Sequence, residues 1–97
     1  MHAAITGFDW DTGNAETCQK HGLSIAKIES VFLGPVMVFA DPSETEVRQR
    51  ATGQTTEGRY VFLVFTILGT LIRVISARHM RKKEITVYEG QAPNTNV

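Results

Sequence analysis

Arg73 lies inside a strand-like run, residues 71–78, in which apolar and polar side chains alternate. Because a strand has a period of two residues, Arg73 shares a face with Leu71 and Ile75. The opposite face receives Ile72, Val74 and Ser76. An arginine in a mostly buried strand needs a partner, and a guanidinium that is fixed near a cleft suits the recognition of a phosphate.

Further arginines surround this run. Arg78 closes it, and a polar segment at 46–52 carries Arg48 and Arg50. We expect that segment to pair near the hairpin that holds Arg73. Converging arginines stabilise the charge that builds on phosphate oxygens when a ribose 2′-hydroxyl attacks the adjacent phosphorus. These residue types therefore fit metal-free RNA cleavage.

Such a reaction also needs a base for the 2′-hydroxyl proton and an acid for the leaving 5′-oxygen. The candidates are Lys20, His21 and Glu46. Each has a structural alternative. Lys20 and His21 fit the end of a helix, where the helix dipole favours cations, and spacing alone favours that interpretation. Glu46 fits a cross-strand ladder with Arg48 or Arg50, which contributes little to stability.

Length and charge indicate one small domain. The chain has 97 residues and a formal net charge of zero. Residues 1–47 hold two Lys against seven Asp or Glu, which gives −5, and residues 48–97 hold eight Arg or Lys against three Glu, which gives +5. Two interpretations stay open, because a basic half can bind a polyanion and the two halves can also neutralise each other in the fold. The basic stretch 81–83 most often forms a solvated helix face.

Several kinds of site and location are disfavoured. Cys18 is the only cysteine, which excludes an internal disulfide and fits a reducing cytoplasm. It precedes His21 by three residues, but nothing orients the pair, so a structural thiol is the stronger interpretation. The spacing of Cys and His predicts no metal site, and no other cofactor is expected. No signal peptide is expected, and the apolar run Tyr60–Leu68 is much shorter than the roughly 20 residues of a membrane-spanning helix.

Cap and turn signals divide the chain into elements. Asp11 and Ser24 are the expected N-caps of two helices, the first ending near His21 at Gly22 and the second at Gly34-Pro35. Strands are expected at Ile5–Trp10, Val36–Ala40, Glu46–Thr52, Tyr60–Ile67 and Leu71–Ala77, with turns at Asp41-Pro42-Ser43 and Thr56-Glu57-Gly58 and a third helix at Met80–Glu89. We expect the strand at 36–40 to be buried.

This order of elements predicts an α+β fold, with a small antiparallel sheet, two N-terminal helices and one C-terminal helix. A single domain is expected over residues 1–89, followed by a disordered polar tail at 90–97. The residues alone thus lead to a small α+β domain with a candidate phosphate site.

Several segments resemble the BrnT family of bacterial type II toxin–antitoxin toxins, a group within the RelE-like ribonuclease superfamily. The matching segments are Phe8-Asp9-Trp10-Asp11, Lys20-His21-Gly22, Ser24–Phe32, Asp41-Pro42, Glu46-x-Arg48 ahead of Gly53, Val61–Thr66, Arg73-x-Ile75-Ser76-Ala77-Arg78 and Glu84-x-x-x-Tyr88. Together they span roughly residues 8–89, and their order and spacing are more specific than any single segment.

The resemblance implies a RelE-like fold and a cytoplasmic toxin that cleaves RNA without a metal and inhibits translation and growth. It also implies a BrnA-like antitoxin that forms a hetero-oligomer with the toxin and supplies the contact with operator DNA.

The resemblance further implies functional roles for six residues: Lys20, His21, Glu46, Arg48, Arg73 and Arg78. We assign stabilisation of the phosphate and of the transition state to the three arginines. Lys20 and His21 act in proton transfer or substrate positioning, and Glu46 is a base or orients Arg48. Arg50 is the reserve candidate for the position of Arg48.

The sequence also departs from the family pattern. The turn after Asp41-Pro42 is short and lacks the usual histidine, Gln54 follows Gly53 where arginine is common, and the loop 68–70 lacks a basic residue. Fewer cations favour an alternative function, a catalytically weak or inactive protein that acts with its antitoxin in operon autoregulation. A phosphate- or nucleotide-binding domain unrelated to toxins is the third possibility.

Overall fold

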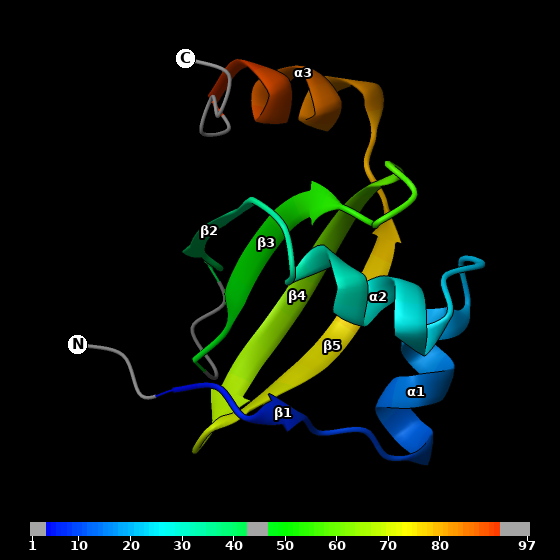
Figure 1. Ribbon diagram of the computed structural model, residues 1–97, viewed down its shortest axis with the longest axis vertical. Helices are drawn as coiled ribbons and strands as arrows, with labels where there is room; N and C mark the ends of the chain where they lie inside the picture. The colour runs from blue at the N-terminus through cyan, green and yellow to red at the C-terminus, as the bar shows by residue number, and fades with distance from the viewer. Residues whose placement is uncertain (1–3, 43–46, 92–97) are drawn as a thin grey trace.

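A computed structural model describes residues 4–42 and 47–91, and within them three helices pack around one five-stranded sheet (Figure 1). The elements are β1 (Gly7–Phe8), α1 (Thr12–Gln19), α2 (Ile25–Val31), β2 (Val36–Ala40), β3 (Gln49–Gln54), β4 (Tyr60–Leu68), β5 (Leu71–His79) and α3 (Lys82–Gln91). The strand order across the sheet is β1-β5-β4-β3-β2. The predicted α+β class is confirmed.

One strand pair departs from the predicted antiparallel sheet. β1 runs parallel to β5, with Gly7 opposite Leu71 and Phe8 opposite Ile72, whereas β2 to β5 pair antiparallel in succession. The sheet is therefore mixed. The prediction rested on short connections between successive strands, and β1 pairs instead with the strand most distant from it in the chain.

The predicted caps of the first two helices are confirmed. Asp11 accepts a hydrogen bond from the Asn14 backbone N–H at 3.1 Å, and the Asn14 side chain accepts one from the Asp11 N–H at 2.7 Å. Ser24 Oγ accepts a backbone N–H of the first turn of α2 at 3.2 Å. α1 ends at Gln19, slightly earlier than predicted, and Gly22 turns the chain with a positive φ of 85°. Local side-chain chemistry thus defines both helix starts.

The predicted strand at 36–40 has the observed bounds but not the expected burial. β2 is an edge strand that pairs with β3, and Val38 and Phe39 remain 50% and 39% exposed. The expectation of burial is wrong because an apolar run looks the same in a central strand as at a sheet edge.

Other boundaries differ by a few residues. The first strand is limited to Gly7–Phe8, and β3 begins at Gln49. Ser43 and Glu46, which belong to the predicted turn and strand, lie outside the described residues. The third helix starts at Lys82, because Met80 still donates its N–H to a carbonyl of β4 and so belongs to the hairpin. α3 continues to Gln91.

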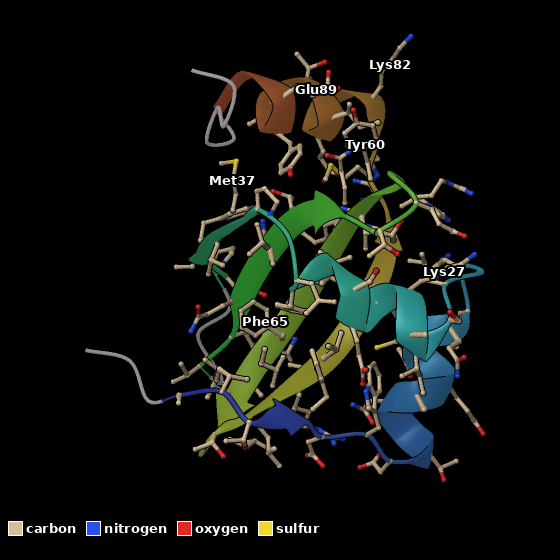
Figure 2. All side chains as sticks on the ribbon, viewed as in Figure 1. Lys27, Met37, Tyr60, Phe65, Lys82 and Glu89 are labelled. Atoms are coloured by element: carbon tan, nitrogen blue, oxygen red, sulfur yellow. The ribbon has the colours of Figure 1, made fainter. Side chains whose placement is uncertain are left out.

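Two apolar cores lie on opposite faces of the sheet. The main core joins α1 and α2 to the sheet and contains Cys18, Leu23, Ile28, Val31, Ala51, Val61, Leu63, Phe65, Ile72, Val74 and Ala77. The small core joins α3 to the other face and contains Phe62, Met80 and Tyr88, flanked by Met37, Tyr60, Val64 and Ile85. In Figure 2 the labelled Phe65 marks the main core and Tyr60 marks the α3 end of the sheet. In the described ranges, no helix combines the length and apolar character that crossing a membrane requires.

A β-bulge interrupts the pairing of β4 and β5. Phe65 lies opposite Val74, but its neighbour Val64 lies opposite Ser76, so Ile75 is an extra residue in β5. A bulge of this kind shifts the alternation of side chains on the strand that carries it.

The shift decides which face receives the end of β5. Ala77 is buried with Val74 in the main core, and Arg78 lies on the opposite face together with Ser76 and Arg73. The prediction that Ser76 lies on the face opposite Arg73 assumes uninterrupted alternation, and it is wrong because of the bulge. The bulge therefore brings both arginines of β5 to one face.

The close approach of α2 and β3 at Gly53 generates a prediction about stability. A Cβ atom built on Gly53 would lie 2.9 Å from the Val31 side chain and 3.3 Å from the Pro35 carbonyl oxygen. Val31 is fully buried and cannot move aside. Gly53→Ala should therefore lower the free energy of unfolding by about 1–3 kcal/mol in urea denaturation.

Gly90→Ala is the matched control. Gly90 is in α3, and outside the helix's own neighbouring backbone no atom of the described residues lies within 4 Å of a Cβ built on it. Alanine there should leave stability unchanged or raise it by about 0.5–1 kcal/mol. Equal stability of Gly53→Ala and the wild type would contradict the assigned packing.

Candidate functional site

Three arginines lie on the face of the sheet opposite α1 and α2. Arg50 of β3 pairs with Val64, whose side chain belongs to the small core, and Arg73 and Arg78 of β5 point to the same face. We call this surface the arginine face and define it by Arg50, Arg73 and Arg78. Arg50 and Arg78 both lie near the Phe62 ring, whereas Arg73 is bound to Asp9 and Asp11 beside β1. The convergence of Arg73 with Arg48 or Arg50 at one phosphate stays a prediction.

Arg73 has the partner that its position demands. Its Nη1 donates to Asp9 Oδ2 at 3.1 Å and its Nη2 donates to Asp11 Oδ2 at 2.9 Å. The bond to Asp11 is the main cause that raises the pKa of Arg73. The pKa of Asp11 is lowered, first by the backbone N–H of Asn14 and then by Arg73. Arg73 therefore joins β5 to the segment that links β1 and α1.

Arg78 is fixed even more completely. Its Nη1 and Nη2 donate to the two carboxylate oxygens of Glu84 at 2.8 and 2.9 Å. Its guanidinium carbon lies 4.2 Å from the centroid of the Phe62 ring, a cation–π distance. Glu84 also accepts the backbone N–H of Arg81 at 2.8 Å. Arg78, by hydrogen bonding, is the main cause that lowers the pKa of Glu84 from 4.5 to about 2.

Arg50 is the least engaged member of the arginine face. Its Nη2 lies 3.6 Å from Asp41 Oδ1, and its guanidinium carbon lies 5.8 Å from the centre of the Phe62 ring. Among the described residues, its Nε is a buried side-chain donor without a hydrogen-bond partner. Arg48 precedes β3 and its carbonyl accepts the Asp41 N–H at 3.3 Å. The structure thus places Arg50, the reserve candidate, within β3 and opposite Val64 of β4, whereas Arg48 lies just before β3.

Lys20 and His21 lie apart from these contacts. Lys20 is the C-cap of α1, where its N–H donates to the Thr17 carbonyl at 3.4 Å, and both side chains are exposed. In the described part of the chain, neither side chain forms a hydrogen bond or an ion pair with the arginine face. Their predicted position at a helix end is confirmed, and their predicted chemical role stays a prediction. Glu46 lies outside the described residues.

Cys18 is a buried thiol of the main core. Its Sγ lies 3.6 Å from the Val74 carbonyl oxygen, and burial raises the pKa of the thiol to about 11. His21 is exposed, so the two side chains form no nucleophilic pair. The structural interpretation of Cys18 is confirmed.

α3 is attached to the sheet by polar contacts along its length. Besides the Arg78–Glu84 pair near its start, Tyr88 donates to the Pro35 carbonyl at 3.1 Å, and Tyr60 donates to Glu89 near its end. The helix lies at one end of the sheet (Figure 1). The small core packs it against the same face of the sheet that carries the three arginines.

The amino-acid sequence does not reveal the cavity that α3 leaves on the arginine face. Arg50, Phe39 and Lys83 are among the side chains that line it. Lys83 belongs to the basic stretch 81–83 that was assigned to a solvated helix face, and its proximity to Phe39 depends on how α3 docks. No local pattern contains that information. Within the residues that the structure describes, no group of three or more His, Cys, Asp or Glu side chains lies together as metal ligands would.

A comparison with protein families finds a match over most of the chain. The family model described as the ribonuclease toxin, BrnT, of type II toxin–antitoxin systems matches residues 10–84. The matched range includes all three residues of the arginine face as well as Lys20 and His21. Among curated proteins no relative matches the chain.

The Arg78–Glu84 pair generates a prediction about pH. Because the pKa of Glu84 in the folded protein is depressed from 4.5 to about 2, its contribution to stability is present above pH 4.5 and is lost as the pH falls toward 2. Glu84→Gln should lower the free energy of unfolding by about 1–3 kcal/mol at pH 7, and the difference from wild type should be smaller at pH 3.

Urea denaturation followed by circular dichroism at the two pH values measures this difference. Glu16→Gln is the control, because Glu16 is an exposed residue of α1 and forms no ion pair with any residue that the structure describes. A difference between Glu84→Gln and wild type that stays the same at pH 7 and pH 3 would show that the carboxylate charge does not stabilise the fold.

Proposed function

Because the chain belongs to the BrnT family of ribonuclease toxins of type II toxin–antitoxin systems, we propose that it is a metal-independent endoribonuclease that cleaves RNA and so inhibits translation and growth. The family match over residues 10–84 is the observation that carries this proposal. The arginine face supports it, because three guanidinium groups on one surface suit a phosphate substrate.

The proposed reaction is the attack of a ribose 2′-hydroxyl on the adjacent phosphorus, with departure of the 5′-oxygen. Arg73 and Arg78, together with Arg48 or Arg50, stabilise the charge on the phosphate oxygens. A guanidinium has five N–H donors, and Arg73 uses two of them on Asp9 and Asp11. The carboxylates thus fix its orientation while other donors stay available to a phosphate.

Proton transfer is assigned to the remaining candidates. His21 is the preferred acid or base, because histidine is the side chain that most often serves in general acid–base catalysis. Lys20 positions the substrate, and Glu46 serves as a base or orients Arg48. The exposure of Lys20 and His21 leaves them accessible to a large substrate.

Membership in a type II system implies a protein antitoxin. We propose that this partner is BrnA-like, forms a hetero-oligomer with the chain in the cytoplasm and contacts the operator DNA. Exposed apolar side chains support a protein partner: Leu33 is 82% exposed, and Val38 and Phe39 lie open on the edge strand β2.

One observation favours the second candidate function, a weak or inactive toxin that acts with its antitoxin in operon autoregulation. Arg73 and Arg78 both lie in two-bond contacts with carboxylates, which reduce the positive charge available to a phosphate. Activity of the isolated chain decides between the two functions.

Growth arrest tests the proposed activity. Induction of the wild-type chain without an antitoxin should stop growth, and the purified protein should cleave RNA in the presence of EDTA. Arg73→Ala and Arg78→Ala should each lower the cleavage rate by about 10²–10³-fold, the usual loss when one donor to a developing negative charge is removed.

Asp11→Asn is the matched control for Arg73. Asparagine caps a helix as well as aspartate does, but it removes one carboxylate from the guanidinium. If Arg73 acts on the phosphate, Asp11→Asn retains cleavage while Arg73→Ala loses it. If Arg73 only ties the chain together, the two variants lose stability and activity in parallel. Harmless expression of the wild type with intact cellular RNA would refute the enzymatic proposal.

His21→Gln tests the proton-transfer role separately. Its side chain is exposed, so the melting temperature should stay within about 1 °C of wild type. The cleavage rate should fall by about 10²–10⁴-fold, the usual contribution of general acid–base catalysis. Lys27→Gln, a control at a half-buried cation of α2 that pairs with Glu57 at 3.4 Å, should cleave RNA at the wild-type rate. Unchanged cleavage by His21→Gln would remove His21 from the mechanism.

A further inference from the structure

A cavity of about 350 Å³ lies between α3 and the arginine face, which is large enough for a small ligand. Its apolar wall is formed by Met37, Phe39, Phe62, Val87 and Tyr88. Figure 2 shows the Met37 side chain extending from β2 toward α3. Phe39 and Val87 are 39% and 53% exposed, so a flat apolar group can reach both.

Positive charge faces this cavity. Arg50 from the sheet and Lys83 from α3 line it. Glu84 also lines it, but its carboxylate is already bound by Arg78 and by the Arg81 N–H. An apolar wall with aromatic rings and neighbouring cations is the combination that binds a base and its phosphate in single-stranded nucleic acid.

Arg50 is the cation best able to accept such a ligand. Its ion pair with Asp41 is long, at 3.6 Å, and its inner Nε has no acceptor among the described residues. Nε itself is enclosed, so the ligand contact falls to the outer nitrogens, one of which faces Asp41. Each outer nitrogen of Arg73 and Arg78 already donates one hydrogen bond to a carboxylate, whereas only one outer nitrogen of Arg50 lies near a carboxylate.

We propose that this cavity binds one nucleotide of single-stranded RNA, with its base against Phe39 and Val87 and its phosphate on Arg50 and Lys83. The inference deepens the ribonuclease function proposed above and rests on it. The nucleotide lies next to Arg78, because the guanidinium groups of Arg50 and Arg78 both lie near the Phe62 ring. The cavity thus selects the nucleotide beside the phosphate that the arginine face holds.

Methionine methyl NMR of the full chain reports on this cavity without requiring cleavage. Met37 lines the cavity, whereas Met80 is buried in the small core and does not line it. The probe is a mixed-sequence 2′-O-methyl tetranucleotide, which cannot be cut because its 2′-oxygen is blocked. Its bases should shift the Met37 methyl resonance through their ring currents and leave Met80 nearly unchanged. Inorganic phosphate alone should not shift Met37.

Two substitutions, each with a matched control, locate the binding. Val87→Trp fills the cavity from α3. It should raise, by about tenfold or more, the tetranucleotide concentration that is needed to shift the Met37 methyl resonance. Thr86→Trp places the same ring on the exposed neighbouring position of α3, outside the cavity, and should bind like wild type. Arg50→Gln should weaken binding to a similar degree as Val87→Trp, because it removes a charged donor to the phosphate. Arg59→Gln, at an exposed position off the cavity, should not.

The outcomes separate this inference from the proposed function. Cleavage by wild type and by Val87→Trp at the same sites and rates, with no Met37 shift, overturns the nucleotide cavity and leaves the ribonuclease intact. A Met37 shift that Val87→Trp abolishes, in a chain that cuts no RNA, supports the cavity and refutes the ribonuclease. A Met37 shift caused by the antitoxin but not by the tetranucleotide assigns the cavity to a protein partner and overturns the proposal.

Discussion

The extra residue at Ile75 is the constraint on which the arrangement of the site depends. A strand that alternates without interruption sends Arg73 and Arg78 to opposite faces, and one of them then enters the main core. The bulge shifts the alternation by one residue, so that Ala77 fills the main core and both arginines lie on the opposite face. Bulges that redirect a side chain are frequent next to functional sites. One irregularity in the hairpin thus decides whether an arginine face exists.

The same arginines hold the fold together and form the candidate site. Arg78 binds Glu84 through two hydrogen bonds and lies over Phe62, so it fixes α3, and α3 in turn closes one side of the cavity. The carboxylates have opposing effects on a phosphate site. They hold each guanidinium in one orientation, which favours catalysis, and they neutralise part of its charge, which opposes it. Arg50, with its longer ion pair, is the member of the face in which the second effect is smallest.

Signals within a few residues of one another predicted most of the secondary structure, and contacts between distant residues produced the differences. Asp11 and Ser24 cap their helices as their types indicate, and the hairpin on either side of Gly69 follows from two β-rich runs and a tight turn. The bulge at Ile75 and the parallel pairing of β1 leave no local signature. Arg73 was correctly singled out as a charge that needs a partner, but the sequence could not say whether that partner is a substrate phosphate or the carboxylates of Asp9 and Asp11.

The contact between Arg73 and Asp9 also imposes an order on the synthesis of the protein. Asp9 is translated early, and the arginine that binds it follows 64 residues later. In the described sheet β1 pairs with β5 alone. The residues of β1 therefore have no strand partner on the nascent chain until β5 has left the ribosome. Closing so long a loop is entropically costly and comes after local structure has formed. The arginine face is therefore completed only after β5 has been translated. A chain that stops before β5 lacks the Arg73–Asp9 contact and two of the three arginines of this face.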